Sequence, residues 1–337
     1  MSDPGRASVV GAGAWGTALA LVLVERGHDV RLWSYESAVA DSIQRHRRNP
    51  YLDGVTLPES LHATSDLTAA VAGAELVVSV SPSQVVRSVM QEAAPHLDSD
   101  AIVVSASKGI ELRSLRRMDE VLAEELGPGL MERFCVLSGP SFAHEVAERA
   151  PTAVVVASRS QDAAERVQDA FQTPWFRSYT NNDVIGVELG GALKNVIALA
   201  AGMTAGLGYA HNTTAALMTR GLAEMARLGL AMGARPATFY GLAGMGDLVL
   251  TCTGSLSRNR TVGYRLGQGE SLDAILLDMK AVAEGVKTAP AVRELAHRHD
   301  VEMPIVEEVC SIVEEGRSPV EALQKLMRRD PKPETWS

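Results

Sequence analysis

The chain has 337 residues, of which 46% are hydrophobic and 22% charged, and a formal net charge of −9 at neutral pH. This length predicts two domains, each large enough for its own core, and the composition is that of an ordinary globular protein. An acidic chain lacks the basic surface that displaces phosphate counterions, so we expect no nucleic-acid partner.

No uncharged apolar run reaches the length of about 18 residues that suggests a membrane span, and we expect none. The first ten residues lack the layout of a signal peptide, so the expected location is the cytoplasm. The three cysteines are far apart in the sequence, which fits neither a disulfide framework nor a zinc site. We predict no metal and interpret them as buried thiols: Cys135, Cys252 and Cys310.

The first half alternates short β-branched runs with longer helical patterns. The expected strands lie within residues 7–10, 29–35, 74–82, 101–109, 134–141 and 152–160, and the first four expected helices within 16–27, 36–47, 85–97 and 116–127. The strands are continuous apolar runs, as expected when both faces of a sheet are covered. Gly27 and the "GPG" after Leu126 are typical of helix ends. The pattern predicts an α/β fold with a mostly parallel, doubly wound sheet.

The second half has helical periodicity only. Strand signals stop after about Tyr179, and helical patterns run from Val184 to Met327. We therefore expect an N-terminal Rossmann domain over residues 1–185 and a C-terminal all-α domain over 186–330; the candidate residues below give the second domain the substrate and the catalytic group. The segment 331–337 has few apolar residues and is expected to be a flexible tail.

The stretch "VVGAGAWGTALA" places Gly11, Gly13 and Gly16 directly between the first expected strand and the first expected helix. The first glycine permits a tight turn, the second lets backbone N–H groups approach a pyrophosphate, and the third lets the helix pack closely on the sheet. In this context the motif predicts a dinucleotide site, for NAD or NADP, rather than a purely structural turn.

The end of the second strand lacks the acidic residue that usually binds the ribose of NAD. Ser34 and Tyr35 occupy that place, and Glu36 follows. Glu36 could still select NAD. Because no acid stands at the usual position at the end of the strand, binding of NADP is also possible. The sequence leaves this choice open.

Two lysines are candidates for chemistry. Lys108 directly follows a strand, which places it at the carboxyl edge of the sheet, where ligands bind. Lys194 lies on a helix that is apolar nearly all round, and burial lowers the pKa of an unpaired ammonium towards the range of proton exchange. The alternative is a structural lysine that reaches solvent or pairs with an acid such as Glu188; with the glycine motif, we favour catalysis.

A further candidate lies in "GMGDLVLTCTGSLSRNR", residues 244–260. Ser257, Arg258 and Asn259 precede a helical pattern and could offer backbone N–H groups and a guanidinium to an anion. A helix cap with a surface arginine would also account for them. Asp247 is either a helix cap or a site carboxylate.

These stretches together resemble one family, the bacterial NAD(P)-dependent sn-glycerol-3-phosphate dehydrogenases. The resemblance is carried, in family order from residue 9 to about 305, by "GAGAWGTALA", "SASKGIE", "LSGPSFAHEV", "IGVELGGALKNVIALAAGM", "TRGLAEMARLG", "GMGDLVLTCTGSLSRNR" and "AVAEGVKTA". It implies a homodimer of two-domain subunits that interconverts dihydroxyacetone phosphate and sn-glycerol 3-phosphate and so supplies the phospholipid backbone.

The resemblance also implies roles for single residues. Lys194 would be the proton donor and acceptor, and Lys108 would help to hold the substrate. The other implied substrate contacts are Gly139, Ser141, Asp247, Ser257, Arg258 and Asn259. The implied cofactor contacts are Gly11, Gly13, Ala14, Trp15, Gly16, Tyr35, Lys108, Ala143, Arg258, Val282 and Glu284. We interpret the Trp15 ring as a wall beside the dinucleotide, with core packing as the alternative.

Three other functions remain to be compared with this one. A different two-domain hydroxyacid or phosphosugar dehydrogenase would share the plan, but "SGPSF" and "TGSLSRN" weigh against it. A non-catalytic dinucleotide sensor would not need Lys194 in an apolar helix. A methyltransferase fits both the spacing of the glycines and the long helical half poorly.

Overall fold

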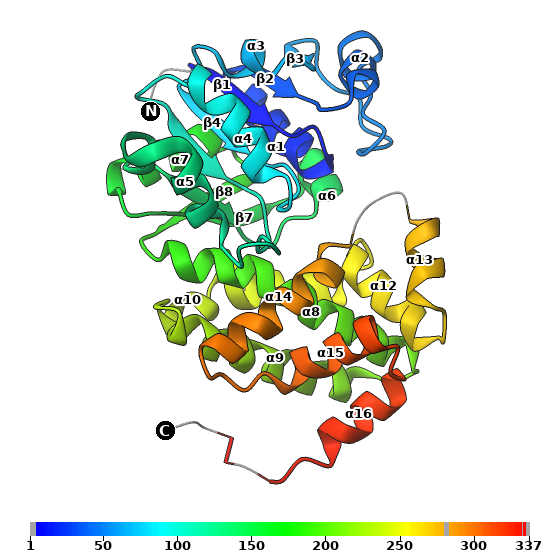
Figure 1. Cartoon of the computed structure of the whole chain (residues 1–337). Coiled ribbons are helices and arrows are strands. Elements are labelled where there is room, and N and C mark those ends of the chain that lie inside the picture. The colour runs from blue at the N-terminus through cyan, green and yellow to red at the C-terminus, as the bar shows by residue number, and fades with distance from the viewer. Residues whose placement is uncertain (1–4, 280–282, 332, 335–337) are drawn as a thin grey trace.

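The computed structural model describes residues 5–279, 283–331, 333 and 334 of the chain. A sheet half with helices on both faces occupies the upper part of Figure 1, and a purely helical half lies below it. The predicted combination of a Rossmann domain with a helical region is confirmed. The last strand ends at Asn181 and the first helix of the lower half begins at Val184. The exact domain division at residue 185 stays a prediction.

One eight-stranded sheet forms the upper half, in the order β3-β2-β1-β4-β5-β6-β7-β8. All neighbouring strands are parallel except β6 and β7. The strands are β1 (Arg6–Val10), β2 (Asp29–Trp33), β3 (Leu61–Thr64), β4 (Leu76–Ser79), β5 (Ile102–Ser105), β6 (Cys135–Ser138), β7 (Thr152–Ser158) and β8 (Phe176–Asn181).

Helices cover both faces of this sheet, which explains its continuous apolar strands. One buried cluster joins the sheet to α1, α2, α6 and α7, and a second joins the opposite face to α3, α4 and α5. Their bounds are α1 (Ala14–Glu25), α2 (Ser37–His46), α3 (Leu67–Val71), α4 (Val86–Ala93), the short η1 (Ala94–His96), α5 (Met118–Met131), α6 (Ala143–Ala147) and α7 (Gln161–Phe171).

The sequence reading missed two strands, β3 and β8. They are the two edge strands of the sheet. An edge strand pairs on one side only and is less completely covered, so its sequence need not be apolar. In β8, "FRSYTN", buried and exposed side chains alternate at the start, which hid the strand from a search for continuous apolar runs.

The two predicted helix ends are confirmed. Gly27 follows α1 with φ 91°, the left-handed conformation expected there. Gly127 also has a positive φ, 74°, and interrupts α5 directly after Leu126. The first helical segment of α5 therefore ends at Leu126, and a separate short segment that includes Pro128 follows it to Met131.

The lower half contains no strand among the residues that the structure describes after Asn181. Its elements are α8 (Val184–Gly206), α9 (His211–Ala231), α10 (Pro236–Phe239), the π-helical turn η2 (Leu242–Gly246), α11 (Asp247–Thr253), α12 (Arg258–Gly267), α13 (Leu272–Asp278), α14 (Glu284–Arg298), α15 (Pro304–Glu315) and α16 (Pro319–Met327). In the expected tail, residues 332 and 335–337 lie outside the described residues.

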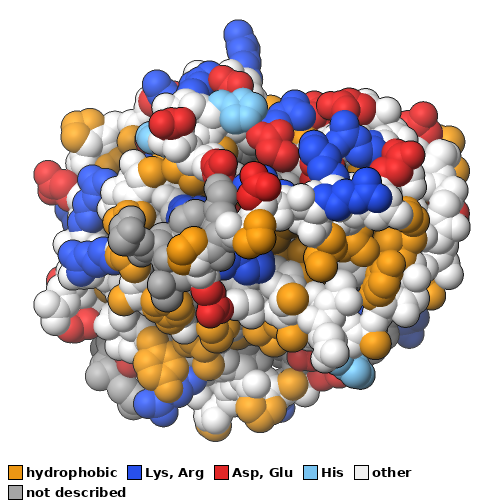
Figure 2. All heavy atoms as spheres, turned by 90° about the horizontal axis from the view of Figure 1, so that it is seen from below, with side chains coloured by type: hydrophobic (Ala, Val, Ile, Leu, Met, Phe, Trp, Pro, Cys, Tyr) orange, Lys and Arg blue, Asp and Glu red, His pale blue; other side chains and the backbone are white. Residues whose placement is uncertain are grey.

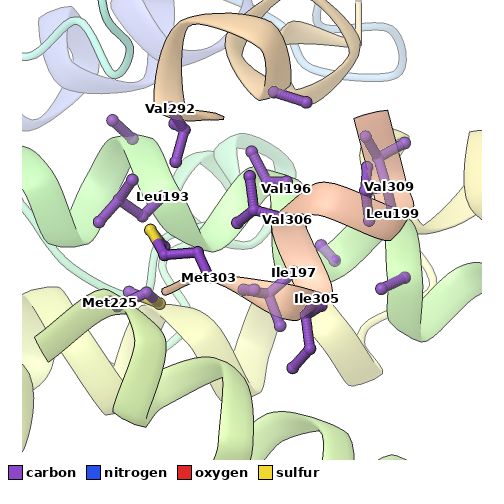
Figure 3. Packing of buried hydrophobic residues seen from close by; sticks show 14 of the residues in the cluster. Leu193, Val196, Ile197, Leu199, Met225, Val292, Met303, Ile305, Val306 and Val309 are labelled. Carbon is purple, nitrogen blue, oxygen red and sulfur yellow. The ribbon is translucent and has the colours of Figure 1, made fainter. Parts of the chain in front are cut away.

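Helix α8 forms the centre of this half. Its apolar side chains pack against residues of α9, α14 and the start of α15, as Figure 3 shows around Leu193, Val196 and Ile197. The helix is long and apolar enough to cross a membrane, but 94% of its most apolar window is buried inside the protein. It is therefore a core helix, and its apolar composition follows from being covered on all sides.

Glycines set the distance between α8 and α12. A Cβ added to Gly263 of α12 would collide with the carbonyl oxygen of Leu199, and one added to Gly202 of α8 would collide with that of Arg260. These two helices therefore approach at backbone contact, which only glycine permits. This packing fixes the start of α12 beside the middle of α8.

We expect Gly263→Ala to destabilise the fold by about 1–3 kcal/mol, because the extra methyl group must push the two helices apart. The measurement is the free energy of unfolding in urea. Gly129→Ala is the matched control, since a Cβ there would meet nothing within 4 Å. Equal stability of the two variants would contradict the close-packing account.

Candidate active site

The glycine turn has the geometry that a dinucleotide cradle needs. Gly11 has φ 132°, and a Cβ at Gly16 would collide with the carbonyl oxygen of Gly11, so the strand and α1 meet at backbone contact. A Cβ at Gly13 would meet nothing within 4 Å, and Gly13 is exposed. The N-terminus of α1, which begins at Ala14, therefore presents its free N–H groups at an open surface, as a pyrophosphate requires.

The end of β2 carries an exposed carboxylate. The Tyr51 hydroxyl donates a 2.5 Å hydrogen bond to Glu36, and this bond is the main reason that the pKa of Tyr51 is raised. Asn49 holds the Tyr51 loop against the glycine turn by donating to the Ala12 carbonyl at 2.9 Å. Tyr35 is 86% exposed with its ring edge-on to Trp33. These side chains lie where an adenosine ribose is bound in this fold.

Trp15 lies in the first turn of α1 and is half-buried. Its ring packs on the core cluster between α1, α6 and the sheet, and its indole nitrogen is buried without a partner among the described residues. Ala143 begins the neighbouring α6. Packing on the core, the alternative for Trp15, is therefore observed, and contact with a cofactor stays a prediction.

Lys194 is buried in the middle of α8, 7% exposed. Its Nζ donates to Asp247 Oδ1 at 2.5 Å and to Thr251 Oγ1 at 2.8 Å. Glu188, which the sequence offered as a partner in the structural alternative, does not pair with Lys194. With about 3.6 residues per turn, Glu188 lies on a different face of α8, where its carboxylate accepts from the backbone N–H of Asp119 at 2.9 Å.

Lys108 meets Lys194 at the same carboxylate. Its Nζ donates to Asp247 Oδ2 at 2.7 Å and to the carbonyl of Gly139 at 3.1 Å. Asp247 is 1% exposed and starts α11, so this buried carboxylate separates two ammonium groups from different halves of the chain. Of the two alternatives for Asp247, the site carboxylate fits the geometry.

The surroundings tune the proton affinity of Lys194. Burial lowers the pKa of Lys194 to about 8, and the cation of Lys108 lowers it as well, while the Asp247 carboxylate opposes both. An ammonium with this pKa exchanges protons near neutral pH, which an ordinary surface lysine does not. The site therefore holds a group suited to acid and base chemistry.

The start of α12 lies beside Lys194. Asn259 donates to the side-chain oxygen of Asn195 at 2.9 Å and accepts from the backbone N–H of Gly285 at 2.9 Å. Ser257 caps the helix by accepting from the N–H of Arg260, and Arg258 is exposed. Ser257 is therefore confirmed as a helix cap, one of the two roles that the sequence allowed, while binding of an anion by Arg258 stays a prediction.

Glu284 begins α14 on the other side of the same cluster. Burial raises its pKa, and the cations of Arg258, Lys194 and Lys108 oppose this. These four groups are therefore close enough to influence one another. Val282, the other residue expected here, lies outside the described residues.

The segment after β6 completes the cluster. Gly139 has φ 141°, and a Cβ there would press on the backbone of Val154 at 3.0 Å. This conformation turns its carbonyl to accept from both Lys108 and the Ser141 hydroxyl, the latter at 3.0 Å. Both predicted residues thus lie beside the lysines.

The sequence reading missed Thr251 and Asn195 as members of the site. Thr251 follows Asp247 by one helical turn and donates to its carbonyl at 2.6 Å, which leaves the hydroxyl oxygen to accept from Lys194. Residues one turn apart share a helix face, so this partner could have been found from the sequence. Asn195 gave no comparable signal.

All three cysteines are buried and free, as predicted. Within residues 5–279 and the described part beyond them, no group of three or more His, Cys, Asp and Glu side chains is placed to hold a metal ion.

The cradle for a dinucleotide follows β1 at the carboxyl edge of a doubly wound sheet, and Lys108, which follows β5 at the same edge, shares Asp247 with the buried lysine of depressed pKa. Together they define a nucleotide-dependent oxidoreductase. The family models of the NAD-dependent glycerol-3-phosphate dehydrogenase N-terminus and C-terminus match residues 6–164 and 183–324. The chain therefore belongs to the NAD-dependent glycerol-3-phosphate dehydrogenase family.

Individual relatives agree with this assignment. Proteins of Geobacter metallireducens and Geobacter sulfurreducens, both named NAD(P)+ glycerol-3-phosphate dehydrogenase, are 57% and 55% identical to this chain. The matches cover 97% and 98% of this chain and 98% and 99% of the relatives. The crystal structure of glycerol-3-phosphate dehydrogenase from Coxiella burnetii is 41% identical, has a TM-score of 0.91, and is matched over 97% of this chain and 99% of that one.

We expect Asp247→Asn to lower the pKa of Lys194 below its value of about 8, because the carboxylate that stabilises the ammonium is lost while burial and Lys108 remain. The measurement is the pH titration of the Lys194 Nζ chemical shift by NMR. Asp273→Asn, at an exposed aspartate of α13, is the control. A pKa that stays the same or rises in Asp247→Asn would contradict the role given to Asp247.

Proposed function

We propose that this protein interconverts dihydroxyacetone phosphate and sn-glycerol 3-phosphate with NAD or NADP, and that Lys194 is the proton donor and acceptor. The observation that carries the proposal is the buried Lys194–Asp247 pair beside Lys108, in a chain that also has the glycine cradle. The names of the relatives favour this reaction over that of another hydroxyacid or phosphosugar dehydrogenase, and over a sensor or a methyltransferase.

The bound nicotinamide supplies or accepts a hydride. During reduction, protonated Lys194 donates its proton to the carbonyl oxygen of dihydroxyacetone phosphate as that oxygen becomes an alkoxide. During oxidation, neutral Lys194 removes the proton of the substrate hydroxyl. An ammonium has three donors; Asp247 and Thr251 accept from two of them, which leaves one for the substrate.

The polar groups around Lys194 suit a small phosphorylated substrate. Arg258 is exposed at the start of α12, and the N–H groups of that helix end favour an anion. Asn259 is fixed between Asn195 and Gly285 and so holds this helix end in place. We therefore assign the phosphate to Arg258 and the start of α12, with Lys108 and Ser141 beside the reacting end.

The same proposal includes the biological setting. An enzyme that forms sn-glycerol 3-phosphate supplies the backbone of glycerophospholipids, and we propose that it does so in the cytoplasm. We further propose a homodimer. Large apolar side chains are exposed on the helical half, among them Leu230, Tyr240, Leu277 and Met327, and Figure 2 shows such side chains on its lower face. We propose that some of these exposed apolar side chains lie in the contact between the two subunits.

We expect Lys194→Met to lower the rate of dihydroxyacetone-phosphate reduction by about a hundredfold to ten-thousandfold, the usual contribution of a general acid. In the wild type, reduction should slow and oxidation should speed up as pH rises through about 8, because the ammonium is the acid and the amine is the base. Rates are measured from NADH and NADPH absorbance in both directions.

The control for this substitution is Lys287→Met, at an exposed lysine of α14. Its rates should match the wild type. Reduction at the wild-type rate by Lys194→Met would exclude the proposed role of Lys194.

The proposed homodimer predicts a mass in sedimentation equilibrium of twice the 35.9 kDa chain. Leu230→Glu and Leu277→Glu, at exposed positions, identify which of these surfaces takes part, because a charge at an apolar interface weakens association. A monomeric wild type at micromolar concentration would contradict the proposal.

A further inference from the structure

The backbone on both sides of Lys108 is tied to a single segment, residues 80–85, which connects β4 to α4. The Ser107 hydroxyl donates to the carbonyl of Ser81 at 2.6 Å. Gly109 has φ 151°, and a Cβ there would overlap the Ser83 hydroxyl at 2.5 Å. Lys108 thus projects from a stretch of chain that lies directly against the 80–85 segment.

Gln84 makes the most specific of these contacts. Its side-chain N–H donates to the carbonyl of Ile110 at 2.7 Å, and its side-chain oxygen accepts from the N–H of Leu112 at 3.0 Å. One side-chain amide therefore pairs with the backbone as a neighbouring β-strand would. Both bonds fix the chain just beyond Lys108.

The next helix adds a charged contact to the same stretch. The Arg87 guanidinium donates to both oxygens of Glu111 at 2.9 and 2.8 Å, and its bond lowers the pKa of Glu111. Glu111 is 7% exposed. Arg87 also binds Glu124 and Glu125 of α5, so its main task is to join helices. The side-chain amide of Gln84, in contrast, bonds to the stretch after Lys108 and to its neighbour Ser83, and to no other element among the described residues.

We propose that Gln84 is a positioning residue of the reaction: its amide holds the chain after Lys108 so that the Lys108 ammonium reaches Asp247 and shares that carboxylate with Lys194. The proposal rests on the proposed function of Lys194. Gln84 acts through Lys108 and not on the substrate.

Displacing Lys108 changes the environment of Lys194 in a defined direction. The charged and titratable groups that face Lys194 are Asp247 and Cys252 of α11, Lys108 after β5, and Glu284 of α14. Arg258 at the start of α12 is a further cation near this set. Lys108 is the cation that lowers the pKa of Lys194 and that also occupies one oxygen of Asp247. If Lys108 withdraws, Lys194 loses a repulsive neighbour and keeps its carboxylate, so its pKa rises.

The test uses Gln84→Met, which keeps the length and volume of the side chain but makes neither amide bond. We expect the KM for dihydroxyacetone phosphate to rise about tenfold, since two hydrogen bonds of ordinary strength hold the segment, and the KM for NADH to rise less, because most of the predicted cofactor contacts lie elsewhere. The pH at which reduction declines should move upward by about half a unit.

Gln168→Met is the matched control. Gln168 is also half-buried, and its side-chain N–H donates to a backbone carbonyl, that of Ser178, at 2.7 Å, but it lies on α7 away from the lysines. A general loss of packing should affect the melting temperature of both variants alike, and only Gln84→Met should change the KM and the pH profile.

Two results would overturn the proposal: wild-type KM and pH profile in Gln84→Met, or equal increases in the KM of substrate and of NADH with an unmoved pH profile. Failure of the proposed function is recognised separately. In that case the rate of reduction by the wild-type enzyme does not decline near pH 8, or it declines in the same way in Lys194→Met.

Discussion

The buried contact between Lys194 and Asp247 is the interaction on which the site depends. An isolated ammonium in an apolar interior loses several kcal/mol of hydration, so it persists as a cation only beside a fixed carboxylate. Asp247 is itself shared with Lys108. The shared carboxylate stabilises the cation of Lys194 only in part, while burial favours the neutral amine. The pKa of Lys194 is about 8 as a result. A group in this state can give and take a proton at neutral pH.

The rest of the fold holds these groups in place. The apolar side chains of helix α8 pack against α9, α14 and α15 (Figure 3), and Lys194 on the same helix is only 7% exposed. Gly202 and Gly263 bring α12 against α8, so that the predicted phosphate-binding end of α12 lies beside the lysine. From the other half, the carboxyl ends of β5 and β6 deliver Lys108 and Gly139. Segments far apart in the sequence thus converge on one carboxylate.

Different parts of this arrangement were predictable to different degrees. The glycine turn could be predicted because its glycines lie close together in the sequence and each has its own role in the local backbone conformation. The edge strands β3 and β8 were not, because exposure removes the continuous apolar signal. Thr251 could have been found from its one-turn spacing to Asp247. The partner of Lys194 was not predictable, because Asp247 is 53 positions away; Glu188, the acid offered in the structural alternative, is near along the helix but lies on another face.

The sequence by itself determined the alternation of strands and helices in the first half apart from the two edge strands, the helical character of the second half, the dinucleotide cradle and the candidate lysines, since each rests on neighbouring residues and short periodicities. Only the tertiary structure decided that Asp247 separates Lys108 from Lys194, that Asn259 is fixed between Asn195 and Gly285, and that Gln84 holds the Lys108 segment. These contacts join residues up to 139 positions apart. Long-range pairing depends on how whole helices and strands pack, and no local pattern in the chain records it.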